Sequence, residues 1–202
     1  MASEGDSNAR DAELAARAVD GDVRALDELI DLHESRVLRV LRLMGVPAQE
    51  REDVAQEVFL RVFRHLRGFR RNRSFQSWLY KICVNAAYDH RGRVGRRAEE
   101  PMADGFEGPA APLTRGGESP EAHHLRITLE RALVDLTDRE RAVFILRNFE
   151  GLETREIART LGITSITVRR HLSRAESRLR ERLEADAGVP LVEERRKKFG
   201  GD

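Results

Sequence analysis

The sequence has few of the residues that build covalent or catalytic centres. It contains one cysteine, Cys83, among 202 residues, which excludes an internal disulfide and a zinc site built from several cysteines. We expect Cys83 to be a small buried apolar residue rather than a reactive thiol. No glycine-rich phosphate loop, pair of catalytic carboxylates or nucleophile elbow appears. We therefore expect no enzyme, and no bound metal or cofactor.

Long hydrophobic runs are also missing. No stretch of about 18 apolar residues could span a membrane, and the N-terminal "MASEGDSNARDAELAARAVDGD" lacks the basic start and apolar stretch of a signal peptide. We expect a soluble, cytoplasmic protein. Aromatic residues make up only 5% of the chain and charged residues 35%, which favours small helical domains over a β-rich core.

Proline and glycine are concentrated in one segment. Residues 98–120, "AEEPMADGFEGPAAPLTRGGESP", hold four prolines and four glycines without periodicity, which predicts a flexible linker. The pattern on either side is helical, without strand alternation or internal repeats. The sequence therefore predicts an all-α protein of two small helical domains. The expected boundaries are a disordered start at 1–11, a domain at 12–95, a linker at 96–120, a domain at 121–186 and a tail at 187–202.

The net charge of only +1 hides a strong segregation of charge. Residues 1–60 carry 14 acidic and 7 basic side chains, whereas 61–97 carry 11 basic and one acidic. Residues 98–160 are again acidic, with 13 carboxylates and 8 cations, and 161–182 hold 6 cations and 2 carboxylates. Two basic segments between acidic ones predict two contact surfaces for one polyanion.

The first domain shows four helical segments, at about 11–20, 23–44, 49–66 and 75–91. In the third, apolar residues recur at helical spacing and predict a face turned to the core. This face comprises Val54, Val58, Val62 and Leu66 beside Ala55, Phe59 and Phe63. It leaves three polar residues toward solvent or a partner, which are Asp53, Gln56 and Glu57.

The second domain has the spacing of a helix-turn-helix. After a helix at about 121–136, Thr137 and Glu140 form a potential capping box ahead of an apolar run. A short helix at 154–161 is followed by Gly162, where a turn needs a positive φ, and by a final helix from about 165 to 183. Its exposed arginines predict DNA binding, although a helical hairpin with solvated arginines has the same pattern. One possible function is therefore that of a helix-turn-helix transcriptional regulator that binds operators without core polymerase.

Two further patterns are specific. Asp53-x-x-Gln56-Glu57-x-Phe59 and Phe75-x-x-Trp78-Leu79-x-x-Ile82-x-x-Asn85 both lie within 53–93. This stretch resembles region 2 of bacterial sigma factors, and 133–179 resembles region 4. Two such regions joined by a short linker resemble the extracytoplasmic-function (ECF) group of the sigma-70 family. The resemblance covers about 12–95 and 121–184.

The resemblance implies an RNA polymerase sigma factor that recognises the minus-35 element and opens the minus-10 element. The implied partners are promoter DNA, core RNA polymerase (the coiled coil of its largest subunit, and its flap region through region 4) and an anti-sigma factor. The implied polymerase-binding residues are Asp53, Gln56 and Glu57. The implied minus-35 residues are Thr167, Arg169, Arg170, Ser173, Arg174 and Arg178.

The implied minus-10 surface combines aromatic, amide and cationic side chains, which suit an unstacked base on a gripped single strand. Its residues are Phe69, Arg70, Arg71, Asn72, Arg73, Ser74, Phe75, Trp78, Lys81 and Asn85. Ordinary core packing is an equally good interpretation of Phe75 and Trp78 taken singly.

Overall fold

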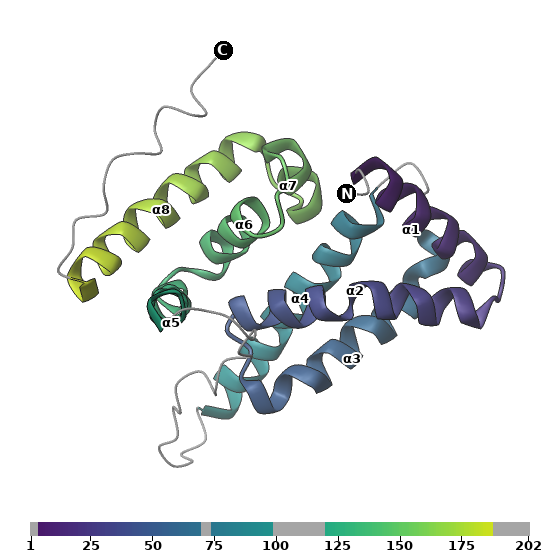
Figure 1. The fold of residues 1–202 in the computed structure, drawn as a ribbon, viewed down its shortest axis with the longest axis horizontal. Helices are drawn as coiled ribbons and strands as arrows, with labels where there is room; N and C mark the ends of the chain where they lie inside the picture. The colour runs from purple at the N-terminus through teal and green to yellow at the C-terminus, as the bar shows by residue number, and fades with distance from the viewer. Residues whose placement is uncertain (1–3, 70–73, 99–119, 188–202) are drawn as a thin grey trace.

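The computed structural model describes residues 4–69, 74–98 and 120–187 (Figure 1). These residues form eight α-helices and one 3₁₀ turn, with no strand among them, so the all-α prediction is confirmed. The linker from 99 to 119, the loop from 70 to 73 and the tail from 188 lie outside the described residues. No helix in the described ranges is long and apolar enough to cross a membrane.

The first module, residues 4–98, contains four helices. They are α1 (Glu4–Val19), α2 (Val23–Leu43), α3 (Ala48–His65) and α4 (Phe75–Ala98), with a 3₁₀ turn, η1 (Leu66–Gly68), after α3. Helix α1 begins well before the helix expected at 11–20, inside the stretch expected to be disordered. Helix α4 likewise continues into the expected linker, because the first proline, which would stop a helix, comes only at Pro101.

Apolar side chains from α2, α3 and α4 meet in the core of the first module. Leu41 and Val58 are fully buried there, and so is Cys83, as the sequence predicts. Burial raises the pKa of the Cys83 thiol well above its usual range, so the residue is an inert core group. Burial of an aliphatic side chain such as that of Leu41 or Val58 contributes about 1.5–3 kcal/mol to stability.

One residue of the expected core face of α3 lies elsewhere. Phe63 is 62% exposed, whereas Val54, Val58 and Val62 are buried. Residues 54, 58 and 62 follow one another at four-residue steps, and Phe63 is rotated by about 100° from Val62 around the helix. That rotation takes Phe63 past the edge of the buried face, so its assignment to the core was wrong.

The second module, residues 120–187, contains α5 (Pro120–Val134), α6 (Asp138–Asn148), α7 (Thr154–Leu161) and α8 (Ser165–Ala187). The predicted capping box starts α6: the amide of Glu140 donates to Thr137 Oγ1 and that of Thr137 to Glu140 Oε2. Leu133, Leu146 and Val168 are fully buried in its core. The two modules lie against each other, with α7 in contact with α4 (Figure 1).

Candidate DNA and polymerase interfaces

Helices α7 and α8 form the predicted helix-turn-helix. Gly162 ends α7 in the left-handed region at φ +66°, and nothing lies within 4 Å of where its Cβ would be. The glycine is therefore required by the backbone conformation rather than by crowding. Ile157 and Val168, one from each helix, are fully buried between them, and Ala158 is buried beside them. These small and branched side chains fix the angle at which α8 is presented.

A threonine cap fixes the start of α8. Thr164 Oγ1 accepts from the amide of Thr167 at 3.1 Å, and the two hydroxyls lie 2.8 Å apart. A side-chain acceptor of this kind satisfies an amide that the first helical turn leaves unpaired. The expected DNA residue Thr167 thus holds the helix start, and its hydroxyl retains capacity for two further hydrogen bonds.

The outer face of α8 carries the cations that the sequence assigns to DNA. Arg169, Arg170, Ser173 and Arg174 are all exposed. Ile166 lies beside them with 72% of its surface exposed, an apolar residue that was not among the expected contacts. His171 is only partly exposed, and burial together with the nearby Arg170 lowers its pKa. The lowered pKa favours the neutral imidazole, so the charge of this face comes from the arginines.

Arg178 differs from the other arginines of α8. Its Nη1 is 2.7 Å from Glu140 Oε2, and the Glu140 side chain is almost fully buried. Glu140 also caps α6, so the ion pair anchors α8 to α6. Truncating Arg178 would leave a buried carboxylate without its cation, which makes this arginine structural as well as a candidate for phosphate contact.

An aromatic cluster lies where α4 begins. The ring centroids of Phe69 and Trp78 are 5.3 Å apart, and each lies 5.6 Å from that of Phe75. Phe75 is buried, whereas Phe69 and Trp78 are half-buried above it. Ser74 caps α4, since its Oγ accepts from the amide of Ser77 at 3.3 Å. Phe75 thus supports the cluster, and the accessible aromatic surface belongs to its two neighbours.

The polar partners of this cluster are further along α4. Asn85 and Lys81 are exposed, and seven residues, close to two helical turns, bring Asn85 to nearly the same side of α4 as Trp78. The expected contacts Arg70, Arg71, Asn72 and Arg73 lie outside the described residues. The described part of the surface is therefore an aromatic platform with an amide and an ammonium group.

Helix α3 presents the third candidate surface. Asp53 and Gln56 are exposed. Glu57 instead accepts from Arg61 at 2.7 and 2.9 Å, and Arg61 also reaches Asp89 of α4 at 2.7 Å. The Glu57 carboxylate is thus already neutralised by a cation of its own module.

Two apolar residues extend the same face of α3. Leu60 is 54% exposed and Phe63 is exposed, and the steps from Gln56 to Leu60 to Phe63 are four and three residues. Exposed apolar side chains that share a face with polar ones are typical of protein interfaces. The sequence does not signal this surface, because Phe63 was expected on the core face and Leu60 belongs to no predicted motif. The side of α3 free of core contacts is consequently mixed polar and apolar.

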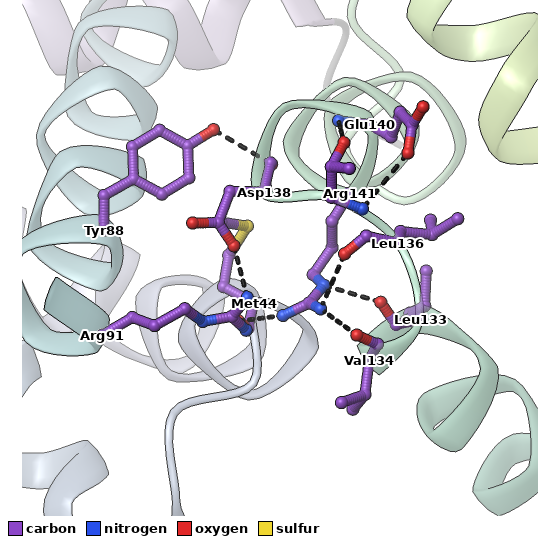
Figure 2. Close-up of polar contacts among 10 residues, drawn as sticks. Met44, Tyr88, Arg91, Leu133, Val134, Leu136, Asp138, Glu140 and Arg141 are labelled. Atoms are coloured by element: carbon purple, nitrogen blue, oxygen red, sulfur yellow. Dashed lines mark hydrogen bonds and ion pairs between the residues drawn. The ribbon is translucent and has the colours of Figure 1, made fainter. Parts of the chain in front are cut away.

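The modules contact one another through a polar interface (Figure 2). The Arg141 side chain is fully buried, and its guanidinium donates to the carbonyls of Leu133, Val134 and Leu136 at 2.6–3.1 Å. It also crosses to the first module and donates to the carbonyl of Met44 at 2.8 Å. Burial lowers the pKa of Arg141 to about 10, which still leaves it charged at pH 7.

Further contacts flank Arg141. Arg91 of α4 pairs with Asp138 and donates to the Met44 carbonyl, and the Tyr88 hydroxyl donates to the backbone of Asp138 at 3.0 Å. A Cβ on Gly45 would come within 2.9 Å of Arg141 Nη1 and 3.0 Å of Arg91 Nη2, so a larger residue in this turn would displace the two guanidiniums. The φ of +86° at Gly45 adds a second reason.

Glu150 is the most enclosed carboxylate of the interface. Its side chain is 1% exposed and lies 2.7 Å from Arg39 and 3.8 Å from Arg36, both on α2. The Tyr80 hydroxyl of α4 donates to its second oxygen. Burial and the adjacent carboxylate raise the pKa of Tyr80 far above its usual range, so the phenol stays a donor.

Both modules are similar in sequence to known protein families. Family models for sigma-70 region 2 and sigma-70 region 4 match residues 29–97 and 126–179. The chain is 34% identical to the RNA polymerase sigma-H factor of Pseudomonas aeruginosa over 92% of its own length and 97% of that protein. It is 32% identical to the ECF RNA polymerase sigma factor SigM of Mycobacterium tuberculosis, over 84% of this chain and 82% of that one.

A solved structure is similar as well. CnrH, determined in complex with the cytosolic domain of CnrY, aligns with a TM-score of 0.66 at 27% identity, covering 88% of this chain and 99% of that one. The fold and its helix-turn-helix place the chain among two-module, all-α transcription proteins. It belongs to the sigma-70 family and, within it, to the ECF group. It is an RNA polymerase sigma factor, not an operator-binding regulator that acts without polymerase.

Proposed function

We propose that α8 reads the minus-35 element through its exposed face. Support comes from the capped helix start and from the exposed Arg169, Arg170 and Arg174 near the N-terminal half of the helix, the part that enters the major groove in helix-turn-helix proteins. Arginine recognises guanine by two parallel hydrogen bonds, and an apolar side chain such as that of Ile166 suits a thymine methyl group. Thr167 and Ser173 complete the proposed contact set, and Arg178 contacts phosphate at its edge.

We propose that the start of α4 opens the minus-10 element. Phe69 and Trp78 offer half-buried rings on which an unstacked base can lie, and the Asn85 amide can pair with its edge. Lys81 and Ser74 line the same surface, and Arg70, Arg71, Asn72 and Arg73 belong to it by sequence. The two tasks therefore fall to different helices. Helix α8 binds duplex DNA, and α4 binds a base removed from the stack.

The aromatic platform with Asn85 two turns away carries this proposal, and Asn85→Ala tests it. The variant should bind minus-35 duplex as the wild type does, yet open the minus-10 element more slowly in the polymerase complex. A fluorescent base analogue in the promoter reports opening. A pre-melted promoter should restore part of the rate, because unstacking is already done. Wild-type opening, or equal failure on the pre-melted promoter, would show that Asn85 only supports the fold.

We propose that α3 docks on core polymerase, with Asp53 and Gln56 as direct contacts and Leu60 and Phe63 as an apolar addition. Glu57 takes part after exchanging Arg61 for a cation of the polymerase coiled coil. The second module binds the flap region. The mixed composition of this face, an exposed acid and amide beside exposed apolar residues, supports the assignment.

The remaining partners and the cellular setting are part of the same proposal. We propose an anti-sigma factor as a partner, supported by the structurally similar CnrH, which was solved with the cytosolic domain of CnrY. The chain acts in the cytoplasm, where polymerase is. It has no catalytic site of its own, because a sigma factor supplies promoter specificity and the core enzyme supplies the chemistry.

A further inference from the structure

The charges of the intermodule interface are divided unequally between its two sides. The first module contributes four arginines, which are Arg36, Arg39, Arg42 and Arg91. Among the described residues, every carboxylate within ion-pair distance of these four comes from the second module. Those carboxylates are Glu130, Asp138 and Glu150. The ion pairs across the interface therefore place the cations on the first module and the carboxylates on the second, whereas Arg141 of the second module crosses to a backbone carbonyl.

The cationic side is continuous. Arg36, Arg39 and Arg42 follow one another at three-residue steps on α2, and Arg91 reaches the Met44 carbonyl near the end of the same helix. At 1.5 Å per residue the four groups extend over ~12 Å of α2. Arg51, half-buried near Arg42, has its pKa lowered by burial and by that second cation. Without the second module, this surface would carry concentrated positive charge.

Promoter binding requires the modules to separate. The minus-35 and minus-10 elements are about 25 base pairs apart, or ~85 Å at 3.4 Å per base pair. A compact body of 202 residues has a radius of gyration of ~16 Å and is therefore only about 45 Å across. With the interface intact, α8 and α4 cannot both reach their elements. Separation removes the second module's carboxylates from the four arginines when the chain binds promoter DNA.

We propose that this surface of the first module is a second DNA-phosphate site, which the carboxylates of the second module cover until the modules separate. The Arg36, Arg39, Arg42 and Arg91 guanidiniums then bind the backbone of the duplex between the two elements. Glu130, Asp138 and Glu150 occupy the positions that phosphates take later. Duplex DNA is the ligand chosen because the second module, once at minus-35, lies along that DNA. The inference rests on the proposed function.

The test uses two variants of the full chain that break one ion pair from opposite sides. Glu150→Gln removes a covering carboxylate and keeps every cation, whereas Arg39→Gln breaks the same pair and removes a cation. Glu52→Gln, an exposed carboxylate on α3, matches the charge change of Glu150→Gln. Affinity for a random-sequence duplex is measured by fluorescence anisotropy between 50 and 200 mM salt.

We expect Glu150→Gln to bind the random duplex about 5-fold more tightly than Glu52→Gln at low salt, with a steeper dependence of log affinity on log salt. Each additional phosphate contact adds ~0.9 to that slope. Arg39→Gln should show a slope lower by about that amount than Glu150→Gln. If Arg39→Gln gains as much as Glu150→Gln, separation alone is responsible and the phosphate site is wrong.

A triple variant covers the case in which one substitution does not separate the modules. Glu130→Gln, Asp138→Asn and Glu150→Gln together remove all the covering charge, and the exposed Glu34, Glu52 and Glu184 changed to Gln form the matched control. Equal slopes for the two triple variants overturn the proposal.

Separation itself is followed by energy transfer between dyes on Ser35→Cys and Ser177→Cys, both exposed, with Cys83 buried and unreactive. Energy transfer should fall as random duplex is added to the otherwise wild-type chain, and constant transfer at saturating duplex contradicts the proposal. Preference of wild type for minus-35 duplex over random duplex is measured in parallel. Its absence would contradict the proposed function, whereas its presence with unchanged slopes contradicts only the second site.

Discussion

The core of each module and the interface between the modules are built from opposite materials. The cores consist mainly of apolar side chains, of which Leu41 and Leu146 are fully buried. The interface buries the Arg141 guanidinium, the Glu150 carboxylate and the Tyr80 phenol, each with a hydrogen-bond partner across it. Apolar burial is favourable in any orientation. A buried ion pair contributes little net stability, because the cost of desolvating its charges is offset only when the geometry is good. The modules are therefore stable bodies, joined by a contact that is specific and separable.

The largest expected effect is within a core. Leu41→Ala should lower the free energy of unfolding by about 3–4 kcal/mol, because it removes buried methyl groups and leaves a cavity. Trp78 is the single tryptophan of the chain and lies in the first module, so its fluorescence during urea unfolding reports this loss. Energy transfer between Ser35→Cys and Ser177→Cys should stay unchanged in the folded state. A change there would mean that core and interface are not separate.

Arg141→Met comes next, because Arg141 belongs to both structures. The substitution keeps the apolar stem but leaves the buried Leu136 carbonyl without its side-chain donor. The Arg141 hydrogen bonds to the Leu133 and Val134 carbonyls are lost as well, and together these losses should cost about 2–3 kcal/mol. It also removes the hydrogen bond to Met44. Thermal unfolding followed by circular dichroism measures the first effect, and energy transfer between the modules the second. Wild-type stability would show that the carbonyls find water.

The sequence allowed much of the two modules to be predicted and nothing of the interface. Helix-turn-helix spacing, the capping box at Thr137 and the positive φ at Gly162 are local, so residue types a few positions apart were enough. The interface joins Met44 to Arg141 and Arg39 to Glu150, 97 and 111 positions apart. One of these partners is a backbone carbonyl, which any residue possesses. No residue pattern signals such a contact.

The exposure of a residue at the edge of a helix face could not be predicted from the sequence either. Phe63 continues the apolar pattern of α3, and its type is compatible with either side of the boundary. The neighbouring helices decide how wide the buried face is, and here they cover Val62 and leave Phe63 to solvent. The error concerns a residue that then became a candidate polymerase contact. An apolar residue misplaced in this way is thus informative about function.

A glycine pair separates backbone strain from contact across the interface. Gly45→Ala and Gly151→Ala both place a side chain at positive φ, +86° and +71°, which should cost about 1 kcal/mol each. Only at Gly45 would the new Cβ also press on the Arg141 and Arg91 guanidiniums. We expect a total of about 1–2 kcal/mol there in urea unfolding, and lower energy transfer between the modules for Gly45→Ala alone. Equal transfer in the two variants would show that the guanidiniums yield without cost.

The smallest expected effect at neutral pH is that of Tyr88→Phe, which removes one hydrogen bond to the Asp138 carbonyl and should cost about 0.5–1 kcal/mol. Its pH dependence is more telling. Burial raises the pKa of Tyr88 from 10.0 to about 12, so the protonated phenol is favoured in the folded chain. That contribution is complete below pH 10 and is lost as pH rises from 10 to about 12. The free energy of unfolding of the wild type, measured in urea, should fall over this range, and that of Tyr88→Phe should fall less. Parallel curves would place the Tyr88 phenol in water, and the interface at that point would be looser than a core.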